Sequence, residues 1–153
     1  LQSPFVIGNE ARPHVLLWET GPDFDRVSAE HYGYSRLASP VTHRRSVVFD
    51  KRRRLWLVDD EFFGDGEHNF AIRFHFDSRL EVEWHDNLVV ARDQELGASV
   101  QIRPVSAESK PEIENLATSR HYGEMRDSAS VCWMVVGGAQ KLSWEIIPVC
   151  PER

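Results

Sequence analysis

Two clusters of polar and aromatic side chains are of the types that could bind an anionic sugar. The first comprises His31, Tyr32, Tyr34 and Arg36, which lie close together before Pro40. Tyrosine rings offer flat faces to pyranose rings, and arginine holds carboxylates through two parallel hydrogen bonds. The same residues could instead form a tyrosine-rich strand edge in which the arginine pairs with a neighbouring acid. Residue type and spacing leave both interpretations open.

The second cluster, His43, Arg44 and Arg45, begins a basic run that extends to Arg54. Such a run could contact nucleic acid, but the chain carries a net charge of −6, the opposite of the positive field that phosphate binders present. Apolar residues interrupt the run, and the acidic stretch 59–61 follows it. We therefore expect two adjacent strands joined by an exposed turn, with cross-strand ion pairs and no nucleic-acid partner. A ligand-facing basic strand end is the alternative.

The remaining metal-ligating side chains do not define a metal site. His75, in the stretch FHF, falls on the polar side of an alternating pattern. One histidine supplies only one of the three or four ligands that zinc needs. Glu67 and His68 follow a Gly-Asp-Gly turn but do not match the spacing of an EF-hand calcium loop. We predict no cofactor and no metal, with His75 as the single candidate ligand.

An alternation of apolar and polar residues is the main structural signal. Phe70, Ile72, Phe74 and Phe76 share one side of the stretch 69–77, which is typical of a half-buried strand. Other stretches are apolar on both faces, and turn signals separate them. These two-sided stretches are 14–19, 54–59, 87–91 and 130–136.

The chain length of 153 residues suits one domain with a single core. We predict a single all-β domain, residues 1–153, with the architecture of an antiparallel, supersandwich-like β-sandwich. It should contain roughly ten short strands and at most one helical turn, best placed at 111–119. No apolar window is long enough to span a membrane, so we expect no membrane partner.

The five tryptophans all fall in strand patterns and are expected in the core. A tryptophan exposed on a flat sheet would instead indicate a carbohydrate-binding module, with Trp84, Tyr32 and Tyr34 as its stacking platform. Cys132 lies in an apolar run and is predicted to be a buried thiol, and a disulfide with Cys150 stays open.

Three ordered blocks resemble a known family. They carry the pattern H-x-G-Y-x-R-L, then V-x-H-R-R-x-V, then D-E-F-x-G-x-G-E-H, and then F-H-F. The pattern is similar to that of the C-terminal β-sandwich region of the heparinase II/III-like proteins, which are bacterial polysaccharide lyases and their relatives. The resemblance covers about residues 27–136, and the opening stretch 2–18 is compatible with it. The blocks are 29–50, 55–76, and 119–124 followed by the run 130–136.

The resemblance implies an α/α toroid before the sandwich, with the polysaccharide in the cleft between them. Lyases of this family abstract the proton beside a uronic acid carboxylate and expel the 4-linked sugar, which needs a neutralised carboxylate, a base and an acid. In the family, these asparagine, histidine and tyrosine residues lie mostly on the toroid, with a further histidine in an HNT-like segment. This chain begins Leu1-Gln2 and has no such segment. We expect a C-terminal piece with no catalytic residues and no lyase activity of its own.

The family resemblance predicts a non-autonomous sandwich that lines one side of an acidic-glycan cleft and braces the missing toroid. A free-standing carbohydrate-binding module, or a structural domain of a catalytically degenerate relative, is the alternative. The full-length protein could hold a structural zinc. Open sheet edges predict a homodimer, and a periplasmic or secreted location is favoured over the cytoplasm. The expected substrate-binding residues are His31, Tyr32, Tyr34, Arg36, His43 and Arg45.

Overall fold

The structure, a computed structural model, describes residues 11–106 and 110–150. In this part of the chain the regular elements are all β-strands, so the all-β prediction is confirmed. The opening residues 2–10, which we found compatible with the family pattern, lie outside the described part. The strands are β1 (His14–Thr20), β2 (Phe24–Tyr34), β3 (Val41–Asp50), β4 (Leu55–Gly64), β5 (His68–His75), β6 (Leu80–His85), β7 (Leu88–Asp93), β8 (Ala98–Pro104), β9 (Glu112–Thr118), β10 (Arg126–Gly137) and β11 (Gln140–Val149).

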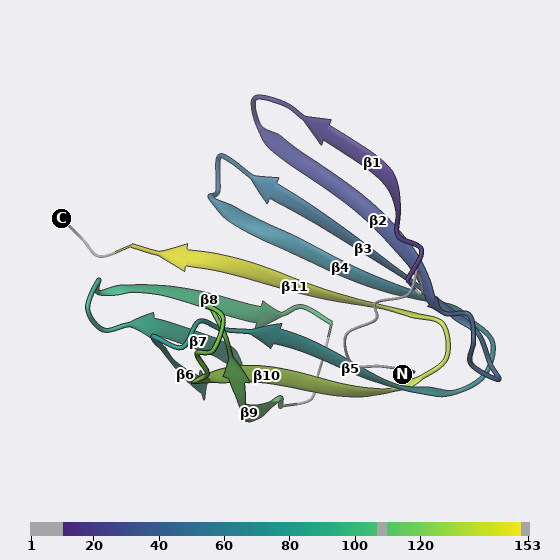
Figure 1. Ribbon diagram of the computed structural model, residues 1–153. Coiled ribbons are helices and arrows are strands. Elements are labelled where there is room, and N and C mark those ends of the chain that lie inside the picture. Colours follow the sequence, from purple (N-terminus) through teal and green to yellow (C-terminus); the bar gives the residue numbers. More distant parts are fainter. Residues whose placement is uncertain (1–10, 107–109, 151–153) are drawn as a thin grey trace.

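The strands form two antiparallel sheets (Figure 1). The large sheet has the order β1-β2-β3-β4-β11-β8-β7-β6, and the small sheet has the order β5-β10-β9. The small sheet packs against one part of the large sheet, while β1, β2 and β3 extend beyond it (Figure 1). The predicted antiparallel sandwich is therefore confirmed, with one sheet much wider than the other.

The core fills the space between the two sheets. Trp133 of β10 and Trp144 of β11 are fully buried, and the ring of Phe74 on β5 meets both, at centroid distances of 5.8 and 5.6 Å. Trp84 of β6 is partly buried and packs 6.3 Å from Trp133. The core prediction is confirmed for these three tryptophans. Trp84 packs against the core rather than serving as a stacking platform for a sugar.

The stretch 111–119, the best candidate for the one helical turn that the sequence allowed, forms strand β9. Glu112–Thr118 pairs with β10 along its whole length, from Cys132 to Arg126. A helix this short is marginal in water, whereas strand pairing satisfies the backbone groups of both β9 and β10. The prediction of at most one helical turn holds in the described residues, and the best candidate for that turn is a strand because a long-range partner, which local sequence does not reveal, decides its conformation.

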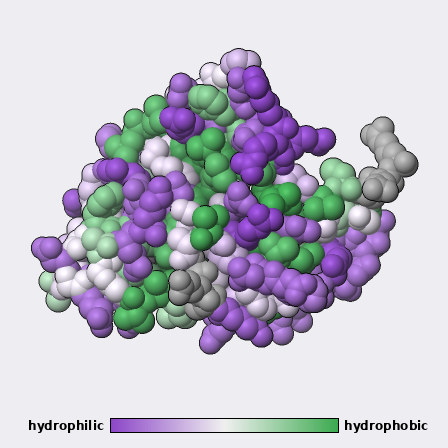
Figure 2. Space-filling model, turned by 180° about the vertical axis from the view of Figure 1, so that it is seen from behind, coloured by the Kyte–Doolittle hydropathy of each residue, from purple (hydrophilic) through white to green (hydrophobic). Residues whose placement is uncertain are grey.

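Strand β1 departs from its predicted burial. The stretch 14–19 is apolar on both faces, yet every residue of β1 is exposed, and Trp18 is 73% exposed. The reason is position, because β1 is the edge strand of the large sheet on the side that the small sheet does not reach. The core prediction is therefore wrong for Trp18. The space-filling view likewise shows apolar patches within a largely hydrophilic surface (Figure 2).

The basic run forms the predicted hairpin. β3 and β4 pair from Val41 with Gly64 to Asp50 with Leu55, and a short charged turn joins them. Ion pairs hold the turn to the neighbouring hairpin; for example, Lys51 Nζ lies 2.8 Å from an Asp25 carboxylate oxygen. The basic side chains therefore find acidic partners within the domain, as the hairpin interpretation predicted.

Candidate functional site

A buried carboxylate lies at the centre of the site. Asp60 on β4 has no exposed surface. Arg45, its partner across the sheet on β3, donates from Nε to Oδ1 at 2.7 Å and from Nη2 to Oδ2 at 2.8 Å. This bidentate geometry is among the strongest that two charged side chains form. Burial alone would raise the pKa of Asp60, but hydrogen bonds from His43 and Arg45 outweigh burial and hold the pKa below its usual value.

Two histidines extend from Asp60 in a hydrogen-bonded chain, which we call the histidine relay. His43 Nε2 lies 2.5 Å from Asp60 Oδ1, and His43 Nδ1 lies 3.2 Å from His31 Nε2. The backbone N–H of Gly33 donates to His31 Nδ1 at 3.3 Å. Because a backbone N–H can only donate, the His31 proton sits on Nε2 and is donated to His43. The second ring in turn donates from Nε2 to Asp60, so both rings are neutral and all four ring nitrogens are engaged.

Packing fixes the rings of the relay in this arrangement. The His43 ring stacks on Phe62 at a centroid distance of 4.8 Å and an interplanar angle of 12°. Burial, together with the neighbouring His43, lowers the pKa of His31 and so favours its neutral form. The hydrogen bonds and the electrostatics therefore favour the same protonation state.

The end of β2 and the turn that follows it carry two further predicted residues. A register irregularity between His31 and Tyr34 brings the Tyr34 ring within 5.2 Å of the His31 ring. Tyr34 is 43% exposed, so its ring is supported on one side and open on the other. Arg36 donates from Nη1 to the Gly33 carbonyl oxygen at 2.6 Å. Gly33 thus ties this turn to the relay through both its N–H and its carbonyl group.

Tyr32 lies in a separate group around Glu30. The Tyr32 hydroxyl donates to the Glu30 carboxylate, and Arg44 Nη2 donates to Glu30 Oε2 at 2.9 Å. The Tyr32 hydrogen bond, followed by that of Arg44, lowers the pKa of Glu30, and the same carboxylate raises the pKa of Tyr32. The Tyr32 hydroxyl is therefore engaged within the domain while the residue remains partly exposed.

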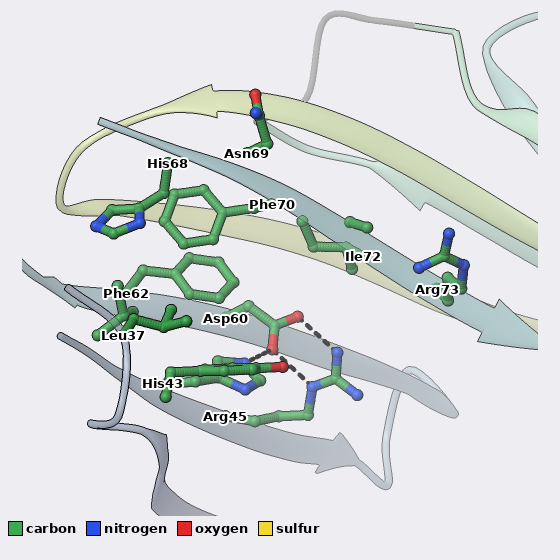
Figure 3. Close-up of a pocket in the computed structure, with 13 residues that line it drawn as sticks. Leu37, His43, Arg45, Asp60, Phe62, His68, Asn69, Phe70, Ile72 and Arg73 are labelled. Atoms are coloured by element: carbon green, nitrogen blue, oxygen red, sulfur yellow. Dashed lines mark hydrogen bonds and ion pairs between the residues drawn. The ribbon is translucent and has the colours of Figure 1, made fainter. Parts of the chain in front are cut away.

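A pocket of about 320 Å³ opens beside the relay, between β3, β4 and the edge of β5 (Figure 3). His68 and Leu37 lie toward one end of the view, and Arg45 and Arg73 lie toward the other (Figure 3). The lining mixes aromatic rings with cationic side chains, a composition that suits a polar ligand with flat faces. Its main aromatic and cationic members are Tyr34, His43, Arg45, Phe62, His68 and Phe70.

The structure brings together four of the six predicted substrate-binding residues and separates two. Those brought together are His31, Tyr34, His43 and Arg45, through the relay and the pocket lining. Arg36 sits in the adjoining turn, and Tyr32 turns toward Glu30 and Arg44.

Sequence reasoning missed two residues of the site. Asp60 was taken as one member of an acidic stretch, although strand alternation puts it in step with Val58 and Phe62, which are both buried. An acid in phase with buried apolar neighbours signals a paired, buried carboxylate. His68 was assigned to a turn, and it joins the pocket because β5 begins there.

The candidate metal ligand does not lie in a metal site. His75 is exposed at the end of β5. In the described residues no group of three or more histidine, cysteine, aspartate or glutamate side chains could hold a metal ion. Cys132 is a buried free thiol, as predicted, and Cys150 is exposed and free. No helix in the described ranges is long and apolar enough to cross a membrane.

Solved structures show that other proteins share this fold. The chain is similar to the heparan sulfate lyase HepC from Pedobacter heparinus, with a TM-score of 0.76 and 20% identity over 92% of this chain and 22% of that one. It is similar to a heparinase III, the BT4657 gene product, with a TM-score of 0.74 and 18% identity over 90% and 22% of the two chains. A putative kojibiose phosphorylase from the human microbiome is a more distant match, with a TM-score of 0.53 and 8% identity over 82% and 18%. The fold is thus a β-sandwich found within larger carbohydrate-active proteins, and this chain spans about a fifth of their length.

The family assignment follows from a second comparison. The model of the heparinase II/III-like C-terminal domain matches residues 2–145. The chain belongs to this family, as the three sequence blocks predicted. No curated protein matches the chain.

Proposed function

We propose that this chain is the C-terminal β-sandwich of a heparinase II/III-like polysaccharide lyase. In that protein it lines one side of the cleft for an acidic glycan and braces the catalytic toroid. Membership of the family supports the proposal, as does the small share of the solved lyases that the chain spans, 22% of each. A sandwich of this kind works as part of a longer polypeptide rather than alone.

The observation that carries the proposal is the Tyr34 ring, partly exposed at the pocket and held by the buried relay. Its neighbour His31 is fixed through His43 to Asp60, which Arg45 holds in turn. A ring presented in this way loses little conformational entropy when a sugar stacks on it. Arg36, anchored on Gly33, places a cation in the same turn, where it suits a uronate or sulfate group.

The relay also explains why we assign binding rather than catalysis to this chain. A β-elimination needs a base with an available lone pair and an acid with an available proton. His31 and His43 have all of their ring nitrogens engaged in the neutral relay. In this proposal, His43 and Arg45 position the turn, Tyr34 and Arg36 contact the glycan, and the toroid supplies the catalytic residues.

The first test is an assay of the 153-residue chain for lyase activity. We expect no new ultraviolet absorbance from unsaturated sugar ends when the chain is incubated with heparan sulfate or other uronate-containing polysaccharides. Turnover by the chain alone would overturn the proposal, because it would place a complete catalytic set on the sandwich.

The second test examines glycan contact in the longer lyase polypeptide that contains the chain. Tyr34→Ala should raise the KM for the polysaccharide about tenfold, the loss that corresponds to roughly 1.4 kcal/mol, with little change in kcat. Tyr122→Ala is the matched control, because Tyr122 is fully exposed and lies away from the pocket. Equal KM values for the two variants would remove Tyr34 from the binding wall.

No observation favours the alternative of a free-standing carbohydrate-binding module. That reading needs Trp84 with Tyr32 and Tyr34 on one flat platform. Trp84 packs against core residue Trp133, Tyr32 turns toward Glu30, and Tyr34 turns toward the pocket. The three rings therefore do not form one stacking surface.

A further inference from the structure

One row of side chains runs across the large sheet, and its exposure increases from the strands under the small sheet to the edge strand. The register aligns Trp144, Val58, Val47, Val27 and Trp18, from β11 to the edge strand β1. The first two are 0% and 4% exposed, the next two are half-buried, and the last is 73% exposed. All five are apolar, so along this row the interior face stays apolar beyond the point where the small sheet buries it.

The neighbouring row continues this apolar face beyond the small sheet. Phe49 of β3 stacks on Trp56 of β4 at a centroid distance of 4.7 Å. A shallow depression of about 310 Å³ lies over these rings; Trp18, Val27 and Val47 supply its other apolar lining, and the polar residues 19, 20, 25 and 26 complete its border. Contiguous apolar surface of this kind on a folded domain marks an interaction site. We call these five residues the apolar face.

Within the described residues, the small sheet has an open edge that borders the pocket of the candidate site. β5 is the terminal strand of the small sheet in the described part of the chain. Consecutive residues 68–73 of β5 all line the pocket, although alternate side chains of a strand point to opposite faces. Side chains from both faces of a strand can line one pocket only when the edge of the strand borders that pocket. Backbone N–H and C=O groups of β5 that do not face β10 therefore point into this space.

Two ring contacts fix the position of the open edge over the large sheet. Phe70 of β5 lies 4.2 Å from Phe62 of β4, and Phe74 lies 5.6 Å from Trp144 of β11, as centroid distances. β5 therefore runs above β4 and β11. A further strand hydrogen-bonded to β5 would lie about 4.8 Å to its side, above β3, and a second one would lie above β2. These strands would cover the apolar face.

The geometry points to an incomplete small sheet: additional β-strands from the part of the longer protein outside this chain pair with the β5 edge and cover the apolar face. This inference rests on the proposal that the domain works within a longer lyase. The row from Trp144 to Trp18 is continuous with the interior of the sandwich, so its occupant should be apolar on its inner side. The solved relatives have ample chain for this, since the matched region is 22% of each. Strands that leave the end near Tyr34 and His68 open would preserve the glycan wall.

A second copy of this chain does not fit the same edge. If two β5 strands paired antiparallel about a two-fold axis, both large sheets would lie on the same side of one continuous small sheet. The overhanging strands β1, β2 and β3 of the two copies would then occupy the same layer. Parallel pairing about an axis along the strands would turn the outer, polar side of the second β5 toward the apolar face. A dimer through this edge is therefore disfavoured, although the other sheet edges are not affected.

The test compares the 153-residue chain with the longer polypeptide that its gene encodes. In the chain alone, the outward-facing amides of β5 should exchange with deuterium at least about 100-fold faster than in the longer protein, because strand pairing protects them. Acrylamide should quench Trp18 in the chain but not in the longer protein. Equal exchange and equal quenching, or a gene that encodes no residues before Leu1, would overturn the inference. Protection of β5 that appears only in a concentrated sample of the chain would assign the edge to a second copy and would also overturn it.

A matched pair of variants sharpens the test. Val15 of β1 and Val136 of β10 are 59% and 62% exposed, and only the first lies beside the apolar face. Val15→Asp and Val136→Asp should both change the Tm of the chain little. In the longer protein, Val15→Asp should lower the Tm by several degrees and restore fast exchange in β5, while Val136→Asp should not. Equal effects would contradict the inference, and neither result depends on glycan binding, which Tyr34→Ala reports separately.

Discussion

The two halves of the large sheet differ in how deeply their interior side chains are buried. Strands β4, β11, β8, β7 and β6 bury most of their interior apolar side chains against the small sheet, whereas in the described residues β2 and β3 are mostly half-buried and β1 is exposed. The row from Trp144 to Trp18 crosses the boundary with no change in apolar character. The difference shows that burial depends on what lies opposite a strand rather than on its own alternation.

The largest loss of stability should come from removing an aromatic ring in the half of the large sheet that the small sheet covers. Trp144→Ala should lower the free energy of unfolding by about 3–5 kcal/mol, because it leaves a large cavity between the sheets. Chemical denaturation would measure this. Trp144→Phe should cost much less, since the indole N–H has no hydrogen-bond partner in the described structure and the substitution loses only ring area. A small effect of Trp144→Ala would mean that the sheets repack around the substitution. The covered half would then not depend on the packing of Trp144.

The boundary between the halves should be nearly as sensitive. Asp60→Asn removes the charge that holds Arg45 and His43, and it should cost about 2–3 kcal/mol by leaving charge-assisted hydrogen bonds incomplete. The matched control is Asp59→Asn on the same strand, where the side chain is about one-third exposed. Asp59 has partners of its own, Lys141 and Ser143. Equal stabilities of the two variants in urea would therefore show that the relay contributes no more to folding than this partly exposed ion pair.

Acid should weaken the same boundary in two steps. Burial and His43 depress the pKa of His31 in the folded state, so between that value and the ordinary 6.5 the unfolded chain binds more protons. Stability is therefore full above pH 6.5 and is lost as the pH falls through the folded pKa of His31. Asp60, also depressed, adds a second loss as the pH drops below 3.8 and through its folded pKa. Tm measured from pH 8 down to pH 2 checks both, and His31→Gln should abolish only the first step.

The smallest effect should come from the uncovered half. Trp18→Ala should change the stability of the chain by less than about 0.5 kcal/mol, because the side chain is already mostly in solvent. Thermal unfolding would measure it beside Trp144→Ala. A loss comparable to that of Trp144 would show that Trp18 is buried in solution, and the contrast between the two halves would fail.

Much of the fold was predictable because strand alternation is a local property. The β3–β4 hairpin, its ion pairs and the buried face of β5 all follow from side chains that alternate along a pleated strand. The stretch 111–119, the best candidate for a helical turn, is a strand because pairing with β10 overrides its weak local preference. The prediction that Trp18 lies in the core was wrong because an edge position is a property of the whole sheet, which no single strand encodes.

The candidate site was only partly predictable. Residue types singled out His31, Tyr34, His43 and Arg45, and the structure places them around one relay and pocket, while their role in substrate binding stays a prediction. The sequence did not reveal that Asp60 would be the shared partner, because it stands among other acids. Nor did it show that Tyr32 would turn away to Glu30, since a register irregularity separates it from Tyr34.

The sequence by itself determined the class of structure and the family, because alternation and ordered motifs can be recognised without knowing which residues are in contact. Only the tertiary structure decided which apolar strands are covered, which histidine nitrogens carry protons and which strand ends the small sheet in the described part of the chain. These features depend on groups far apart in the chain: Phe74 meets Trp144, and Asp60 meets Arg45 and His43. Burial and protonation depend on such long-range contacts, so they are fixed only when the strands and sheets pack together.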